Sequence, residues 1–390
     1  MQAPSEKKMA RNIAVDVYRG TVMLLMMAEV LRLATVAKGY PDNPIWQFLG
    51  YNQTHVEWAG LSLHDMIQPS FTLLAGVALP YSIHSRQRRG QTFRSMLLHT
   101  IWRSFLLVML GILLRGIQHV TFEDTLTQIG LGYTVVFLLA FCKPRWQWTS
   151  LAVVLFGYWL AWALYPVAGA GFDYASVGVP LDWHTHLFSG FAAHWNKNAN
   201  LGAAFDHWFL NLFPRSKPFL YNRGGYLTLS FIPTLGTMIL GLIAGRWFVT
   251  SAPSIPLRRL IVGGLLLLTG GLLLHFTGIC PIVKRVWTPA WVLFSGGICY
   301  LVLAALGWLI DVRQHRRWGT ALVIIGTNSI AAYLLAELCG SPLNHLIRLG
   351  GGMVMQQPHV WDSLVFGAVE LTLFWMVLWT MHRKKIFVRI

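Results

Sequence analysis

The 390-residue chain has few charged residues, and this shortage is not typical of soluble proteins. Asp, Glu, Lys and Arg together make up 12% of the sequence, about half of the roughly 25% that soluble domains carry. Its four cysteines have no metal-ligand spacing. The sequence also lacks a P-loop, a dinucleotide-binding glycine motif, a nucleophile elbow and an H-E-x-x-H motif. Any nucleotide-bearing cofactor would therefore bind through Arg and Lys at helix ends rather than in a soluble nucleotide fold.

Acidic residues are scarcer than basic ones. The chain has 15 Asp and Glu against 31 Lys and Arg, a formal net charge of +16, and such an excess can indicate a nucleic-acid-binding protein. Here, however, the basic residues gather in short clusters between apolar segments, as the positive-inside rule predicts. We therefore interpret the charge as a topology signal and expect no nucleic-acid partner.

Apolar residues are abundant. They make up 55% of the chain, and aromatic residues 13%. Apolar runs near the length of a bilayer crossing recur from end to end. The sequence predicts one all-α polytopic membrane domain, residues 1–390, with both termini cytoplasmic. About ten transmembrane helices are expected, at Ile13–Val36, Leu61–His84, Met96–Ile117, Thr127–Cys142, Thr149–Val167, Tyr226–Val249, Leu260–Thr277, Pro289–Ile310, Thr320–Cys339 and Asp362–Met381.

The longest polar segment, residues 168–225, is longer than a simple connecting loop, and loops of such length are usually functional or disordered. It is rich in Trp, Phe, His and Asn rather than in Ser, Glu and Lys, so disorder is not expected. Within it, Ala203–Phe213 is typical of a short interfacial helix. We expect this segment to cap the outer mouth of the helix bundle.

A polar cluster lies at the entrance of the second predicted helix, where residues 52–70 read N-Q-T-H-V-E-W-A-G-L-S-L-H-D-M-I-Q-P-S. Ionisable groups are costly in a bilayer, so their presence there favours a functional site. His55 is suited to taking and returning a proton near neutral pH. An adjacent carboxylate, from either Glu57 or Asp65, would orient its ring. The competing interpretation is an interfacial histidine in contact with water.

Other polar residues interrupt the apolar runs. In the first helix Asp16 with Arg19, and Glu29 with Arg32, are spaced for one helix face. The first pair is typical of structural ion pairing, whereas the second fits a site or structural pairing equally. Further interruptions are Arg103, Arg115, Gln128, Asn328 and Glu337. Hydrogen bonds between helices explain Gln128 and Asn328 as easily as an active site does.

The chain resembles the heparan-α-glucosaminide N-acetyltransferase family of transmembrane acetyltransferases and its bacterial relatives. D-V-Y-R-G, from Asp16, is similar to the start of that family's first core helix. H-V-E-W-A-G-L-S-L-H-D-M-I-Q-P-S-F, from His55, is similar to its H-x-x-W-x-G-x-x-x-x-D-x-x-x-P-x-F signature. T-Q-I-G-L-G-Y, G-T-N-S-I-A-A-Y and the final R-K-K-I-F also resemble family segments, so the likeness spans nearly the whole chain.

The resemblance implies transfer of an acetyl group from cytosolic acetyl-CoA to a sugar amine or hydroxyl on the outer side of a membrane. His55 would be the general base or acetyl carrier, with Asp65 or Glu57 orienting it. It also implies a homodimer in contact with membrane lipid, in a bacterial inner (plasma) membrane, acting on a saccharide or glycoconjugate without a metal. The candidate substrate-binding residues are Glu29, Trp58, Gln68, Arg115, Gln128, Asp206 and Asn328, and the candidate CoA-binding residues are Arg19 and Arg103.

The chain departs from the family pattern at two places. Val30, with Glu29 beside it, occupies the helix-1 position where family members usually carry Asn. Y-N-R-G-G at Tyr221–Gly225 replaces the family's acidic D-P-E-G, while Asp206 matches the Asp of its outer segment. The chemistry can thus persist with a different acceptor or a different oxyanion partner.

The alternative hypothesis is a secondary transporter or a flippase for a sugar or lipid-linked sugar. It would use the intramembrane residues Glu29, Arg32 and Arg115 as a substrate path. The sequence shows no internal repeat of the kind that many transporters carry. Its polar groups also gather at one face of the membrane, which favours the acyltransferase.

Overall fold

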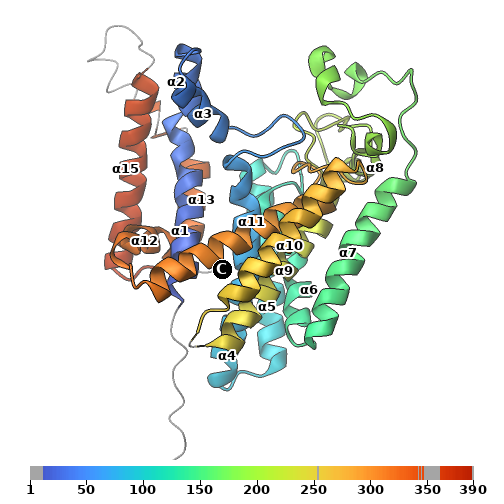
Figure 1. The fold of residues 1–390 in the computed structure, drawn as a ribbon. Helices are drawn as coiled ribbons and strands as arrows, with labels where there is room; N and C mark the ends of the chain where they lie inside the picture. Colours follow the sequence, from blue (N-terminus) through green and yellow to red (C-terminus); the bar gives the residue numbers. More distant parts are fainter. Residues whose placement is uncertain (1–11, 253, 341, 344, 347–360, 389–390) are drawn as a thin grey trace, which may run out of the picture.

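The computed structural model describes residues 12–388 except 253, 341, 344 and 347–360. All regular elements in this part of the chain are helical (Figure 1). The N-terminal basic residues Lys7, Lys8 and Arg11 lie outside the described residues. The α-helices are α1 (Ile13–Met27), α2 (Leu33–Gly39), α3 (Pro44–Asn52), α4 (Ile67–Arg88), α5 (Phe93–Arg115), α6 (Thr125–Ala140), α7 (Pro144–Leu164), α8 (Leu201–Phe209), α9 (Phe231–Ser251), α10 (Leu257–Phe276), α11 (Pro289–Gly307), α12 (Thr320–Thr327), α13 (Ser329–Leu334) and α15 (Asp362–Arg383).

Short 3₁₀ and π turns extend some of these helices and lie between others. They are η1 (Ala28–Leu31), η2 (His64–Met66), η3 (Ala175–Val177), η4 (Leu181–His186), η5 (Gly190–Trp195), η6 (Leu210–Leu212), η7 (Thr228–Ser230), η8 (Trp308–Val312), η9 (Arg317–Gly319) and η10 (Leu335–Cys339).

The helices match the predicted membrane segments. Within the described residues, seven helices are long and apolar enough to cross a bilayer, or nine if each of two bent pairs is one span. The shorter apolar helix α6 lies at the remaining predicted position. The prediction of an all-α polytopic membrane protein is confirmed, whereas the orientation of the termini stays a prediction.

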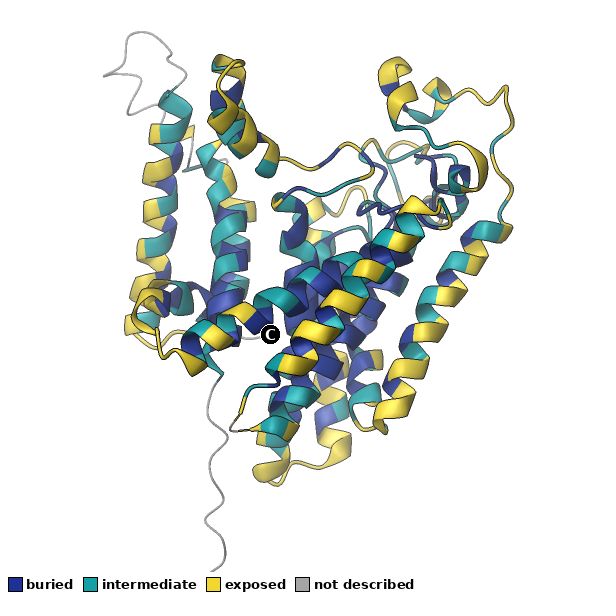
Figure 2. Cartoon of the chain, viewed as in Figure 1, coloured by how far each residue is buried: buried dark blue, intermediate teal, exposed yellow. Residues whose placement is uncertain are grey.

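The core of the bundle is built around α4, α9 and α11, the long apolar helices with the largest buried shares, and Figure 2 shows the buried residues concentrated at the centre of the bundle. In the most apolar stretch of α9, 78% of residues are buried, against 17% in α10 and 22% in α15, whose outer faces are available to lipid. Glycines let α4 and α9 approach closely: a Cβ on Gly241 would lie 2.0 Å from the carbonyl oxygen of Leu73. Small residues at such interfaces are typical of membrane helices. This packing fixes α4, which carries much of the site described below.

The structure differs from the predicted elements at three points. The first span bends by 44° where Arg32 adopts a left-handed backbone (φ 50°). The expected loop after it contains α3, because the Asn43 side chain caps the amides of Ile45 and Trp46 and Pro44 starts the first turn. The ninth span breaks by 73° at Asn328, between α12 and α13.

The segment 168–225 forms short 3₁₀ turns and α8 at one end of the bundle, the same end as α2 and α3 (Figure 1). The expected short helix is confirmed as α8 and η6. The Trp58 indole donates to the carbonyl of Trp195 at 3.1 Å, tying this segment to the polar loop that carries His55. Its role as a cap over an outer mouth stays a prediction.

Candidate functional site

The loop that connects α3 to η2 folds around one carboxylate. Asp65 is 1% exposed, and its Oδ2 accepts the amides of Val56 and Ser62, each at 3.2 Å. Its Oδ1 lies 2.8 Å from Nδ1 of His55, whose side chain is 36% exposed. Because a carboxylate can only accept, the His55 ring nitrogen donates to it. The ring is thus held through Nδ1, and its other nitrogen, Nε2, remains for chemistry.

A second loop, between α10 and α11, lies beside this one. The Thr288 hydroxyl caps α11 and also donates to the carbonyl of Pro281 at 2.7 Å, which closes the loop. An isolated bridge pairs Ala59 with Val283, and the amide of Gly60 donates to the carbonyl of Ile282. Gly60 has φ +126°, which side chains rarely adopt. The pairing places Lys284, the next residue, at the histidine.

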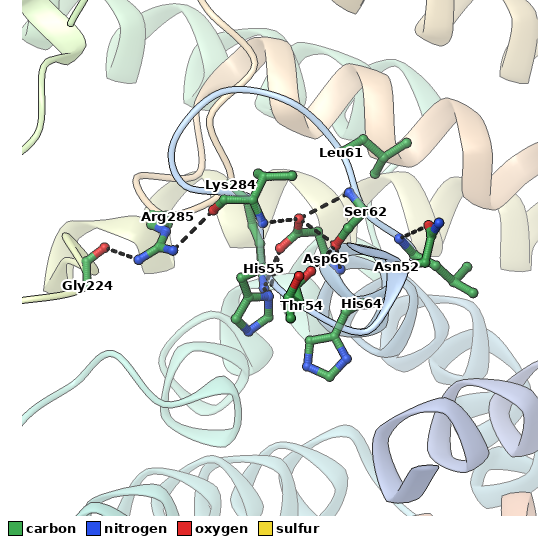
Figure 3. A network of polar contacts seen from close by, with 12 residues as sticks. Asn52, Thr54, His55, Leu61, Ser62, His64, Asp65, Gly224, Lys284 and Arg285 are labelled. Atoms are coloured by element: carbon green, nitrogen blue, oxygen red, sulfur yellow. Dashed lines mark hydrogen bonds and ion pairs between the residues drawn. The ribbon is translucent and has the colours of Figure 1, made fainter. Parts of the chain in front are cut away.

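Lys284 completes the cluster in Figure 3. Its Nζ lies 3.3 Å from Asp65 Oδ1 and 3.2 Å from His55 Nδ1, and its side chain is 5% exposed. Burial lowers the pKa of Lys284 to about 8, against the opposing effect of Asp65. The ammonium is therefore the main form of Lys284 at neutral pH, and it begins to lose its proton when the pH rises toward 8.

The ring of His55 faces a cavity of about 320 Å³. An adjoining cavity of about 500 Å³ shares six of its lining residues and is strongly polar. The residues common to both are Met26, Glu29, His55, His64, Arg115 and Glu337. Together the two cavities provide space in front of His55 for a polar acceptor.

Two further cavities follow on the opposite side of Phe71. One of about 230 Å³ shares Phe71 with the His55 cavity, and one of about 480 Å³ shares Ser82 with the former. The last is lined by basic and polar side chains, including Arg86, Arg89 and His99. A single face of α4, continued by Arg89, contributes to three of the cavities through Ile67, Gln68, Phe71, Ala75, Ala78, Ser82, Ser85, Arg86 and Arg89.

Several residues predicted for the site do lie there. Glu29 and Arg115 line both cavities near His55. Gln68 lines the smaller one and donates to Gln128 at 3.2 Å, and Gln128 also accepts from Thr234. Arg115 is held by the buried Asp124, at 3.2 Å.

The two candidate CoA-binding arginines line the cavity beyond Phe71. Arg19 comes from α1 and Arg103 from α5. Arg103 donates to the hydroxyl of Tyr133 at 3.0 Å, and its guanidinium lies over the same ring. The predicted pair of Asp16 with Arg19 is present at 3.9 Å. Positive charge is thus present on the far side of Phe71 from His55.

Other predicted residues serve different contacts. Of the two candidate orienting carboxylates, Asp65 contacts His55, whereas Glu57 is exposed and its charge acts on Lys197. Trp58 is buried as an anchor for the 168–225 segment.

Two more predicted substrate-binding residues contact backbone and do not themselves line these cavities. Asp206 accepts the amide of Thr228 at the start of η7. Asn328 is fully buried and pairs with the C-terminal tail, donating to the carbonyl of Ile386 and accepting from the amide of Val388.

Sequence reasoning missed Lys284 and Glu123 as candidate site residues, and it placed His64 in the polar cluster without giving it a role. The His64 ring lies 4.6 Å from that of His55, and Glu123 lines the same cavity, where burial raises the pKa of its carboxyl group. The available signal for Lys284 was its place in a predicted outer loop, where the positive-inside rule disfavours lysine. No group of three or more His, Cys, Asp or Glu able to hold a metal occurs among the described residues.

Comparison of the sequence with known proteins finds two related enzymes. No family model matches the chain. The chain is 25% identical to human heparan-alpha-glucosaminide N-acetyltransferase over 419 aligned positions, which cover 97% of the chain and 59% of the human protein. The mouse protein of the same name gives 24% identity, covering 96% of the chain and 60% of that protein. The chain is a distant relative of these heparan-alpha-glucosaminide N-acetyltransferases.

The similarity has a defined extent. The chain spans about three fifths of the length of these N-acetyltransferases, and the match runs through nearly all of this chain rather than through one motif. The loop that carries His55 and Asp65 and the face of α4 therefore belong to the region shared with the heparan-alpha-glucosaminide N-acetyltransferases.

Asp206 provides a test of stability that is independent of activity. Burial raises the pKa of its carboxyl group to about 7, from a usual value near 3.8. Between these values the folded chain keeps a proton that the unfolded chain releases, so stability falls as the pH rises from about 4 to 7. Asp206→Asn should remove on the order of 1–4 kcal/mol of this pH dependence, at about 1.36 kcal/mol per pKa unit.

The measurement is the difference in melting temperature between pH 5 and pH 8 in detergent. The exposed Asp173, in the same segment, offers a matched control as Asp173→Asn, which should keep the wild-type difference. An unchanged difference in Asp206→Asn would contradict the assignment.

Proposed function

We propose that the protein is a membrane acyltransferase that moves an acetyl group from acetyl-CoA to a sugar amine or hydroxyl. The observation that carries this proposal is the His55–Asp65 pair at one end of a row of cavities whose other end is basic. The distant relationship to N-acetyltransferases supports the same reaction.

The row of cavities suits a long donor with an anionic end. The phosphates of CoA would bind near Arg86 and Arg89, since arginine recognises phosphate through paired hydrogen bonds. The pantetheine arm would then pass Arg103 and Phe71 to bring the thioester to His55. From Ile67 to Arg89, α4 rises roughly 30 Å at about 1.5 Å per residue, close to the thickness of a bilayer core. A donor entering at the basic end would thus reach an acceptor on the opposite side.

His55 acts as the general base in this reaction. Nε2 takes the proton of the acceptor amine or hydroxyl as its nitrogen or oxygen attacks the thioester carbonyl. A new C–N or C–O bond forms, the C–S bond breaks, and the proton passes from Nε2 to the departing sulfur of CoA. Asp65 fixes the ring so that Nδ1 keeps its own proton. The competing route, with the acetyl group carried on Nε2, predicts labelled protein when acetyl-CoA is added without acceptor.

The charge in front of His55 favours an amine over a hydroxyl acceptor. Three carboxylates, from Glu29, Glu123 and Glu337, line the cavity. Its two strong cations are already matched, because Arg115 contacts Asp124 and Lys284 contacts Asp65. The excess of negative charge would attract an acceptor that arrives as an ammonium ion. That ion releases one proton to solvent, and the neutral amine then attacks the thioester with His55 as its base.

The direct test is transfer of radiolabelled acetyl from acetyl-CoA to a panel of amino sugars and neutral sugars by the purified protein in detergent. The proposal requires label on an acceptor and a rise in melting temperature when CoA is added. Absence of both effects would overturn it.

The basic cavity gives a separate prediction for the donor. Arg86→Ala and Arg89→Ala should each raise the Kd for CoA about 10- to 100-fold, because a hydrogen bond to a charged group contributes about 1.5–3 kcal/mol. Titration calorimetry with CoA at fixed salt measures this. Arg258→Ala removes an exposed arginine outside these cavities and should leave the Kd within about twofold of wild type. Equal loss in all three variants would indicate general electrostatic attraction rather than a site.

One observation favours the transporter alternative: the 73° break between α12 and α13 is of the type that transporters use to expose backbone groups to substrate. Here the C-terminal tail fills the break, since the side-chain amide nitrogen of Asn328 donates to the carbonyl of Ile386 and its amide oxygen accepts from the amide of Val388. The response to CoA separates the two hypotheses, because a sugar carrier has no reason to be stabilised by it.

A further inference from the structure

Lys284 is a buried cation that no motif pointed to, and it contacts the proposed general base directly. Its Nζ lies 3.2 Å from His55 Nδ1 and 3.3 Å from Asp65 Oδ1. Asp65 is the nearest negative charge to both groups. On its other oxygen, the amides of Val56 and Ser62 and the Ser62 hydroxyl (2.9 Å) occupy the acceptor positions. One carboxylate charge is therefore shared by two groups that can each become cationic.

This sharing has a consequence for the protonation of His55. If His55 took up a second proton while Lys284 was charged, an imidazolium and an ammonium ion would lie 3.2 Å apart with one carboxylate between them. Like charges at this distance disfavour each other strongly, above all in a partly buried site. The ammonium thus favours the uncharged ring, which is the form that a general base needs.

We propose that Lys284 is a positioning residue that keeps His55 uncharged between turnovers by sharing the carboxylate of Asp65 with it. The inference rests on the proposed function, because it assigns His55 the role of a base. The pKa of Lys284 near 8 agrees with it: the ammonium persists through the neutral and acidic range in which an unassisted imidazole would gain a proton.

The other charged or titratable groups around Lys284 do not replace it in this role. Arg285 is directed to the carbonyls of Gly224 and Val56. The His64 ring lies beside the His55 ring in a tilted arrangement, and Glu29, whose side chain is 68% exposed, lies 3.9 Å from His64. Arg115, Glu123, Glu337, Tyr226 and Tyr333 complete the charged or titratable lining of the cavity.

A purely structural lysine, bridging the two loops, is the competing explanation. It predicts that removal of Lys284 lowers activity equally at every pH. The proposal instead predicts a change in the pH dependence, because without the ammonium the Asp65 charge acts on His55 alone.

The experiment compares Lys284→Met and Lys284→Arg. In Lys284→Met, the acidic limb of the kcat/KM–pH profile for acetyl transfer should move upward by about one to two pH units, since each unit corresponds to about a tenfold change in protonation. Arginine stays charged throughout this range, so Lys284→Arg should keep the limb within about 0.3 units of wild type. If the methionine variant does not fold, Lys284→Gln retains a polar contact with Asp65 and should show the same shift.

A second readout does not require activity. Diethyl pyrocarbonate modifies the neutral imidazole, so the pH at which His55 is half-protected can be followed by peptide mass spectrometry. That midpoint should rise in Lys284→Met by the same amount as the kinetic limb, whereas the exposed His207 should show no change. Coincident midpoints for wild type and Lys284→Met would overturn the inference. If no transfer is ever detected but the midpoint shifts, the proposed function fails while the charge relation between Lys284 and His55 stands.

Discussion

Replacement of His55 by alanine is expected to lower acetyl transfer by about 10²–10⁴-fold, the usual contribution of a positioned general base. The variant removes the imidazole that contacts Asp65 through Nδ1 and lines the 320 Å³ cavity. Binding of CoA should persist, because the basic cavity lies at the far end of α4. Initial rates and the melting-temperature shift on adding CoA measure the two effects separately.

His64 supplies the matched control for this prediction. Its ring lies 4.6 Å from that of His55, tilted against it, and lines the same cavity, so it shares the surroundings without the hydrogen bond to Asp65. His64→Ala should therefore retain far more activity than His55→Ala. Turnover near wild type in His55→Ala, or equal loss in both variants, would exclude His55 as the base.

Replacement of Ala78 by tryptophan is expected to abolish transfer by closing the passage between the basic cavity and His55. Ala78 lines the cavity of about 230 Å³ next to Phe71, and an indole would fill much of that space. The His55 end of the protein would stay intact, with its general base in place but without a thioester within reach. The predicted loss is at least about 10²-fold, comparable with the loss of the base itself.

An equivalent substitution elsewhere controls for the added bulk. Ala161 lines a separate apolar cavity of about 210 Å³, with Tyr158 and Trp162. Ala161→Trp should therefore transfer acetyl at close to the wild-type rate. Full activity in Ala78→Trp would show that the donor does not use this route, and loss in both variants would indicate a defect in folding, which melting temperature and gel filtration would reveal.

The helices were the most predictable part of the molecule. Long apolar runs predict membrane spans, and each predicted segment coincides with a helix or a bent pair of helices. The shape within a span was not predictable from hydropathy. The break at Asn328 depends on pairing with the C-terminal tail, and the bend at Arg32 depends on a single backbone angle.

The local part of the site was also predictable. His55 and Asp65 are ten residues apart in one polar segment, and both interrupt an otherwise apolar sequence. Lys284 is separated from His55 by 229 residues and reaches it through the pairing of Ala59 with Val283. Neither loop has a periodic sequence pattern that predicts the contact between Lys284 and His55. Asp206 and Trp58 were candidates because they match the family pattern, and such a match does not distinguish a residue that contacts a ligand from one that hydrogen-bonds to backbone.

Helix α4 both lines the cavities and sets the distance between their two ends. Its cavity-facing residues recur every three or four positions from Ile67 to Arg89, so the cavities at its basic end and at its His55 end lie along the same face of the helix. One residue inserted between them would turn one end by about 100° relative to the other while changing the length by only about 1.5 Å. The mean hydropathy of the helix would hardly change, yet the cavities at its basic end and at its His55 end would no longer lie on the same face. The distance between the two ends can therefore change without loss of this alignment only by whole helical turns.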